Sequence, residues 1–129
     1  MQLLMPKLQL VGWDRSLHAV RNHHEDYEGA IVRALVQDMD YVPSKSFDLV
    51  ISLGCLHNLK LHELKPALKD IERVGRHAYI MVESFRNEQE LFNLQCWCLT
   101  AETLIRPEDW EFLFREYGYT GDHEFIYFT

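Results

Sequence analysis

Ionisable side chains follow several short apolar runs of this chain, at the points where the runs end. His57 is one of them, and histidine is the residue whose ordinary pKa lies nearest neutrality. His57 is therefore a candidate general base, which would remove a proton from a hydroxyl or amine of a substrate that accepts a transferred group. Asp14 ends an earlier run, where a carboxylate can accept hydrogen bonds from both hydroxyls of a ribose. Glu83 ends a later run and is a candidate for substrate binding or acid–base chemistry.

Each of these residues also has a purely structural interpretation. Asp14 or Ser16 can cap the helix that follows, by accepting hydrogen bonds from free backbone N–H groups. His57 can cap the next helix or bond a backbone carbonyl. Glu83 can pair with Arg86 in a loop. The sequence leaves these alternatives open.

The stretch from Ser46 to Leu59 is the element that must position this chemistry. A turn signal, Pro-Ser-Lys, precedes it, and an apolar run over residues 47–51 ends before Gly54. A short apolar run between turn residues is typical of a strand buried on both faces, in the middle of a parallel α/β sheet. Ligands of such sheets bind beyond the carboxyl ends of the strands. We therefore expect the site over residues 52–58.

The remaining chain predicts a single α/β domain over residues 1–129. The helix over Leu61–Val74 has apolar residues at helical spacing, with Pro66 expected in its first turn and Gly75 just past its end. Further strands are expected over residues 7–14, 30–39, 77–84 and 124–128, and further helices over residues 16–27 and 106–117.

Residues 88–103 fit two interpretations. They are either a packed segment or a substrate-side lid whose aromatic side chains stack on an acceptor. Cys96 and Cys98 flank Trp97, but no second cysteine pair accompanies them, so we expect no metal site.

Three segments in order carry a resemblance to a known family. Residues 43–52 read Pro-Ser-Lys-Ser-Phe-Asp-Leu-Val-Ile-Ser, residues 56–59 read Leu-His-Asn-Leu, and residues 71–75 read Ile-Glu-Arg-Val-Gly. Together they resemble the second half of a class I S-adenosylmethionine-dependent methyltransferase, with Asn58 where a second histidine often falls. The resemblance implies a Rossmann-like sheet flanked by helices, S-adenosylmethionine as cofactor, and methyl transfer to a small-molecule acceptor.

The resemblance also implies a role for each residue at the ends of the strands. In that family a carboxylate after the second strand holds the ribose, and an acid followed by an apolar residue lies against the adenine. A loop of solvated acids is the alternative for the second of these positions. The matching residues are Asp14 with Trp13 for the ribose, Asp38 and Met39 for the adenine, Ser52, Leu53 and Gly54 for the methionine end, and His57 and Glu83 for the reaction centre.

The family's first strand and its glycine-rich loop have no counterpart in this chain. We therefore expect a partial, N-terminally truncated domain, whose first residues resemble the tail of the helix that follows that loop. The missing strand would lie between the strands expected at residues 7–14 and 47–53, leaving two free edges. The chain is then a fragment of a longer protein, or the two strands pair directly, or a second chain covers the edge, as in a homodimer. A non-catalytic remnant or fragment that acts as an interaction module is the alternative function.

Charge and composition indicate which classes of partner the protein does not bind. The 129 residues carry a formal net charge of -7 and a pI near 5.4, which argues against a nucleic-acid partner held by phosphate contacts. No apolar run approaches the roughly 20 residues that span a bilayer, so we expect no membrane association. Three cysteines without a disulfide spacing, and no signal peptide, favour a cytoplasmic protein.

Overall fold

The computed structural model describes residue 5, residues 7–25, residue 27 and residues 29–129. It has a mixed α/β fold, as the sequence predicted. The expected continuation of an upstream helix falls largely on residues 1–4 and 6, outside the described residues. In chain order the elements are β1 (Val11–Asp14), α1 (Leu17–Arg21), β2 (Ala30–Arg33), β3 (Phe47–Leu53), a 3₁₀ turn (Leu56–Asn58), α2 (Leu61–Val74), β4 (Gly75–Glu83), α3 (Glu88–Trp97), α4 (Pro107–Glu116) and β5 (Asp122–Ile126).

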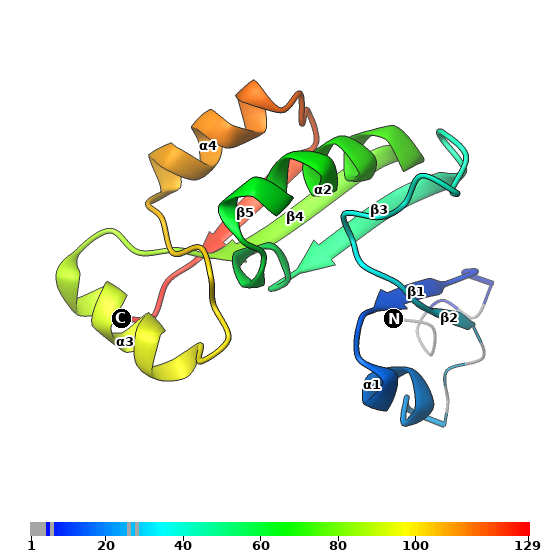
Figure 1. The fold of residues 1–129 in the computed structure, drawn as a ribbon, viewed down its shortest axis with the longest axis horizontal. Coiled ribbons are helices and arrows are strands. Elements are labelled where there is room, and N and C mark those ends of the chain that lie inside the picture. The colour runs from blue at the N-terminus through cyan, green and yellow to red at the C-terminus, as the bar shows by residue number, and fades with distance from the viewer. Residues whose placement is uncertain (1–4, 6, 26, 28) are drawn as a thin grey trace.

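The strands form two separate parallel sheets, which Figure 1 shows side by side. One contains β1 and β2, and the other has the order β3-β4-β5. This arrangement agrees with an incomplete Rossmann-like fold. It corrects the alternative in which the strands beside the gap pair directly, because β1 and β3 share no ladder among the described residues. Within the described part of the chain, each of these two strands keeps one edge without a partner.

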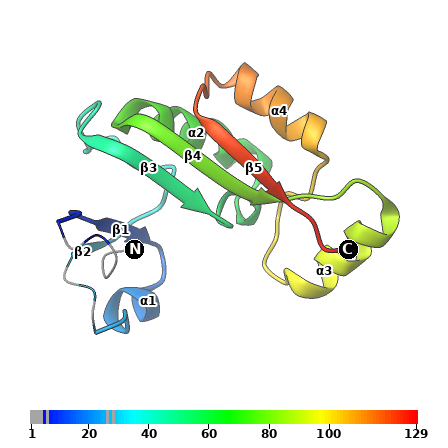
Figure 2. The same cartoon turned by 180° about the vertical axis from the view of Figure 1, so that it is seen from behind.

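Helix α2 packs its apolar stripe on one face of the larger sheet. Its side chains Leu64, Leu68 and Ile71 are fully or almost fully buried against Ile80 and Val82 of β4. Helix α4 lies on the same side of the sheet, beside α2 (Figure 1). The view from behind shows the opposite face of β3, β4 and β5 with no helix over it (Figure 2).

The start of α2 differs from the expectation that Pro66 lies in its first turn. The helix begins at Leu61, and Pro66 lies inside it. The Glu63 side chain accepts a hydrogen bond from the Lys60 backbone N–H at 2.8 Å, which fixes the earlier start. The helix ends at Val74, as predicted, and Gly75 follows, where a Cβ would approach the His77 carbonyl oxygen to 2.7 Å.

Several predicted elements are shorter in the structure. The strand expected over residues 30–39 ends at Arg33, the one expected over 7–14 covers only its last four residues, and α1 ends at Arg21. The last bond of the ladder joins the Ala34 N–H to the Asp14 carbonyl. Beyond it, Val36 and Met39 pack with the core and no longer continue the strand. The last strand begins at Asp122, two residues earlier than expected.

A small second core joins the segment between β2 and β3 to α2. Met39 and Val42 are buried with Val74. The buried Asp70 carboxylate accepts the Met39 N–H at 3.1 Å and the Arg73 Nε at 3.1 Å. The Arg73 guanidinium in turn donates to the Met39 and Val42 carbonyls. These contacts hold residues 39–42 on the helix, between the two sheets.

Candidate functional site

The carboxyl ends of β3 and β4 bring His57 and Glu83 into direct contact. His57 Nδ1 lies 2.6 Å from Glu83 Oε2, and both side chains are almost completely buried, at 2% and 7% exposure. Neither atom makes a hydrogen bond of standard geometry to a described residue, so this close contact is the polar contact that each has in the fold. Arg86, the alternative partner for Glu83, pairs with Glu90 instead, with Nε 3.1 Å from Oε1. The sequence predicted both rim residues but not their pairing.

A glycine turn and a backbone clasp place His57. Gly54 has a φ of +59°, and a Cβ at this position would lie 3.0 Å from Glu83 Oε1. A side chain would therefore crowd the carboxylate in a backbone conformation that favours glycine. The His57 carbonyl accepts hydrogen bonds from the N–H groups of Glu102 and Thr103, at 2.9 and 3.0 Å. The segment after α3 thus covers the rim and excludes water from the pair.

Burial sets the protonation state of His57. Removing the ring from water lowers its pKa below the ordinary value, and the Glu83 charge opposes this only in part. A neutral imidazole donates from one nitrogen and accepts at the other. Because Glu83 can only accept when ionised, the proton is assigned to Nδ1. Nε2 then carries a free lone pair, since it makes no hydrogen bond to a described residue.

The lowered His57 pKa predicts that acid destabilises the fold. Between the lowered pKa of the folded state and about 6.5, the unfolded chain binds a proton that the folded chain does not. The stabilisation is thus complete above about pH 6.5 and is lost as the pH falls. Urea unfolding at pH 7.5, 6.5 and 5.5 measures it, and His57→Gln is expected to flatten this dependence.

The control is His62, an exposed histidine on α2. A His62→Gln variant should keep the pH dependence of the wild-type chain. An unchanged slope in the His57→Gln variant would show that the buried ring does not cause the acid sensitivity.

Asp14 ends β1, a strand of the smaller sheet. Its charge is among the causes that raise the pKa of the neighbouring Cys55 thiol, after burial. One Asp14 oxygen, Oδ1, accepts the Ser16 N–H at 2.7 Å, and Ser16 Oγ accepts the Ala19 N–H at 3.3 Å. The capping interpretation therefore holds for Ser16, whereas Asp14 bonds the backbone just before the helix. Asp14 is exposed and Oδ2 makes no hydrogen bond to a described residue, so the ribose role stays a prediction.

The other predicted nucleoside residues are scattered. Asp38 is exposed, whereas Met39 lies in the second core at 4% exposure and packs against protein. Trp13 donates through Nε1 to the Tyr41 hydroxyl at 3.0 Å and packs edge-to-face on Phe47. The structure gives Met39 and Trp13 structural contacts that the sequence did not reveal. Their roles toward an adenosyl group stay predictions.

The residues predicted for the methionine end follow one another along the rim. Ser52 is buried, and its Oγ has no hydrogen-bond partner among the described residues, so a polar group there is left to be satisfied. Leu53 is exposed, and Gly54 forms the turn. The described residues contain no cluster of histidine, cysteine and acidic side chains that could hold a metal ion.

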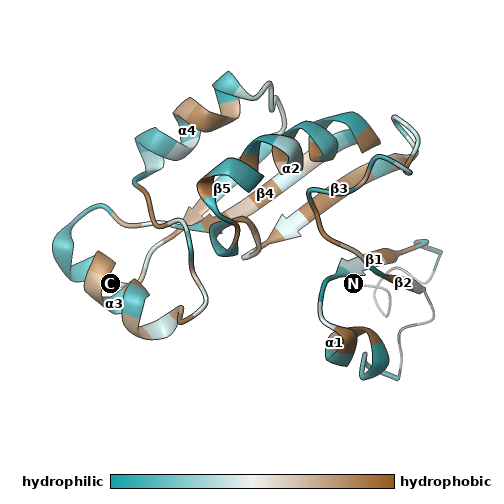
Figure 3. Ribbon diagram, in the orientation of Figure 1, coloured by the Kyte–Doolittle hydropathy of each residue, from teal (hydrophilic) through white to brown (hydrophobic). Residues whose placement is uncertain are grey.

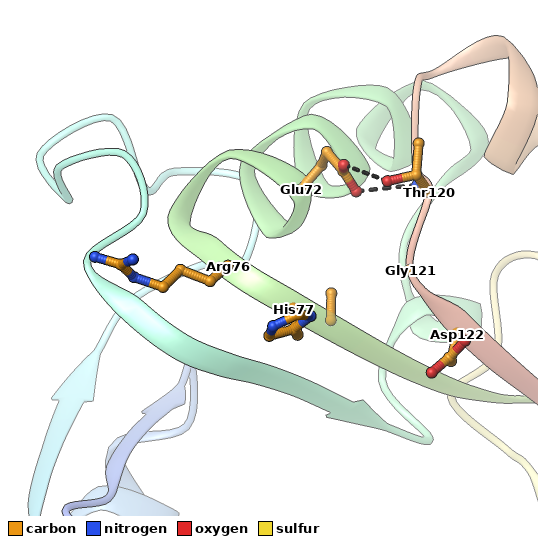
Figure 4. Close-up of a pocket in the computed structure, with 8 residues that line it drawn as sticks. Glu72, Arg76, His77, Thr120, Gly121 and Asp122 are labelled. Atoms are coloured by element: carbon orange, nitrogen blue, oxygen red, sulfur yellow. Dashed lines mark hydrogen bonds between the residues drawn. The ribbon is translucent and has the colours of Figure 1, made fainter.

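A hollow of about 180 Å³ lies at the other end of the larger sheet (Figure 4). Glu72, Arg76, His77 and Asp122 line it together with Thr120. Both Glu72 oxygens bond Thr120, with Oε1 2.6 Å from Oγ1 and Oε2 3.0 Å from the N–H. Its carboxylate is thus satisfied within the fold. The hollow is at the amino ends of β4 and β5, away from the His57–Glu83 pair.

Comparison with known proteins adds one match. The model of a family described as methyltransferase domain matches residues 2–82. The match includes His57 and ends immediately before Glu83. No curated protein and no solved structure matches the chain. Among the helices of the described part of the chain, none is long and apolar enough to cross a lipid bilayer.

Proposed function

We propose that this chain, which belongs to the methyltransferase domain family, transfers a methyl group from S-adenosylmethionine to a small-molecule acceptor at the rim of β3 and β4. The buried His57–Glu83 pair is the observation that carries the proposal. A histidine and a carboxylate in direct contact beyond the strand ends are the parts of a base and its orienting group. The proposal includes a cytoplasmic location.

Residues at the ends of β1 and β3 fit the cofactor in type. Asp14 offers a free carboxylate oxygen for ribose hydroxyls, and Ser52 Oγ is a buried polar atom without a partner. Gly54 leaves space that a Cβ would fill. S-adenosylmethionine, when bound, supplies a methyl carbon that its sulfonium makes electrophilic, so the protein chiefly has to align the acceptor.

The pair would take the acceptor's proton as the methyl group transfers. His57 is held neutral by burial, so Nε2 can accept a proton from an acceptor hydroxyl. Glu83 fixes the tautomer through Nδ1 and stabilises the imidazolium that forms. Water has little access to the ring, which keeps it from competing for the same nitrogen.

Calorimetric titration with S-adenosylhomocysteine tests the proposal. We expect the purified chain to bind it and the Asp14→Ala variant to bind about 10- to 100-fold more weakly, because hydrogen bonds to a charged group are worth roughly 1.5–3 kcal/mol. Asp40→Ala removes another exposed carboxylate and is the matched control. A folded chain that gives no binding heat would overturn the enzymatic proposal.

An interaction module of the same fold is the second candidate function. The uncovered face of the larger sheet favours it, because parallel sheets are almost always covered on both faces (Figure 2). A folded chain that does not bind S-adenosylhomocysteine but associates through that face would identify the module. The titration therefore separates the two candidates.

A further inference from the structure

The His57 ring is almost closed off from solvent, although the proposed reaction needs it. A general base must lie within roughly 3 Å of the group whose proton it removes. His57 is 2% exposed, and Leu56 beside it is fully buried. Ser84, which follows Glu83, is fully buried as well. An acceptor molecule cannot reach His57 Nε2 through so small an opening, so part of the rim has to move before the proton can be transferred.

One segment over the rim has no buried residue. We call this segment, residues 98–102, the strap. It lies in neither a helix nor a strand, and Leu99 within it is 87% exposed. Figure 3 shows hydrophobic and hydrophilic residues mixed along the loop from α3 to α4, of which the strap is the first part. Burial, and after it the Glu83 charge, raises the pKa of the Cys98 thiol, so the strap begins close to the buried pair. Segments with few buried contacts are the least stable parts of a fold.

Few contacts hold the strap down. Within the described residues, two hydrogen bonds join it to the turn after β3. The Glu102 N–H donates to the His57 carbonyl at 2.9 Å. The Thr100 hydroxyl donates to Asn58 Oδ1 at 2.7 Å, and we call this exposed bond the latch. Both bonds can break without any side chain leaving the core.

The two ends of the strap are fixed more firmly. Trp97 ends α3, and its ring packs on Phe128 at 4.7 Å between centroids. Thr103, just past the strap, is buried at 5% exposure. Its hydroxyl donates to the Leu59 carbonyl at 2.7 Å. The strap is thus a short, weakly held segment between two anchored residues, which is the construction of a lid.

We propose that the strap is a lid over the buried pair, which opens between Trp97 and Thr103 and admits the methyl acceptor to His57 Nε2. This inference rests on the proposed function. Opening breaks the latch and the Glu102 bond. The Thr103 N–H donates to the same His57 carbonyl at 3.0 Å, so that carbonyl keeps a partner and the ring keeps its place. Closing over the bound acceptor then excludes water while the proton moves to Nε2.

Amide hydrogen exchange of the wild-type chain, followed by NMR, tests the opening. The N–H groups of Glu102 and Thr103 bond the same carbonyl, yet only the first leaves it when the lid opens. We expect the protection factor of Glu102 to be at least about 10-fold lower than that of Thr103, because local opening costs less than opening the whole rim. Equal protection of the two amides would overturn the lid, since the strap would then open only together with its anchor.

Removing the latch tests whether the strap controls access to the base. Thr100→Val removes the latch hydroxyl and keeps the shape of the side chain. We expect Glu102 to exchange about 2- to 10-fold faster, which is the effect of losing one ordinary hydrogen bond. His57 should react with diethyl pyrocarbonate faster by the same factor. The matched control is Thr120→Val, which removes a hydroxyl bonded to Glu72 at the other end of the sheet and should leave both rates unchanged.

Peptide mass spectrometry resolves His57 from the exposed His62, whose rate should be the same in all three chains. Faster Glu102 exchange with an unchanged His57 rate in Thr100→Val would overturn the lid, because the strap would not control access to the ring. Neither measurement needs the cofactor. A chain that passes both but does not bind S-adenosylhomocysteine would overturn the proposed function alone, and one that binds it but fails them would overturn the lid alone.

Discussion

Trp110→Ala is expected to lower the free energy of unfolding by about 3–5 kcal/mol, the range for removing a large aromatic side chain from a core. Trp110 is fully buried on α4, and its ring stacks with Phe114 at 5.9 Å between centroids. Removing it leaves a cavity between α4 and the sheet that the surrounding side chains can fill only in part. Urea unfolding at pH 7.5 measures the loss.

Two further variants define the cause. Trp110→Phe keeps most of the apolar contact and removes an indole N–H that has no hydrogen-bond partner among the described residues, so it should cost far less. Leu61→Ala changes a side chain that is 57% exposed on α2 and should cost under about 1 kcal/mol. A Trp110→Ala variant as stable as Leu61→Ala would show that α4 does not pack on the sheet as described.

Glu83→Ala is expected to destabilise the chain by about 1–3 kcal/mol, because His57 Nδ1 would be left buried without its acceptor. Glu83→Gln keeps an acceptor oxygen at the same place and should cost less. It removes the charge that raises the His57 pKa, so that pKa should fall further below its ordinary value. Proton NMR of the His57 ring across pH 4–8 measures the direction of the shift, and urea unfolding measures the stability.

The two readouts separate contact from mere proximity. In Glu83→Gln the charge that raises the His57 pKa is gone and only burial, which lowers that pKa, still acts on the ring. A His57 pKa that rises in this variant would therefore contradict the assigned pairing. Equal stability of Glu83→Ala and the wild-type chain would show that Nδ1 has another partner. Glu124→Gln on β5 is a suitable control, because its carboxylate bonds the Tyr79 hydroxyl at 2.6 Å and not His57.

Three parts of the fold position the buried His57–Glu83 pair on which the functional proposal rests. His57 comes from the turn after β3, and Glu83 ends β4, so neighbouring parallel strands deliver both to one edge. The clasp from Glu102 and Thr103 then closes over them. A change at any of these three places should therefore alter both the stability of the rim and the basicity of Nε2.

The helical spacing of apolar residues determined the best-predicted parts of this protein. The stripe through Leu64, Leu68 and Ile71 specified α2, and Pro107 in the first turn specified α4. The apolar runs before Gly54 and before Ser84 specified the two strands that carry His57 and Glu83. Local patterns suffice here because a long periodic run needs little help from the rest of the chain.

Shorter signals were decided by tertiary contacts. Residues 34–39 read as a continuation of β2, yet the strand ends at Arg33. Asp70 and Arg73 hold the backbone of Met39 on α2, and its side chain completes a core with Val74. Pro66 read as a residue of the first turn, but the Glu63 bond to Lys60 begins the helix at Leu61, five residues before it. In one case residues distant in sequence, and in the other a side-chain cap, outweighed the local propensity.

The sequence by itself determined that His57 and Glu83 reach one rim, since the alternation of strand and helix carries the ends of neighbouring strands to one edge of a parallel sheet. Only the tertiary structure decided what those residues do there. It paired His57 with Glu83 and not Glu83 with Arg86, and it left β1 and β3 in separate sheets. The physical reason is that pairing depends on which strands lie adjacent and on what excludes water from them. The spacing of residues along the chain predicts neither the adjacency of the strands nor the exclusion of water.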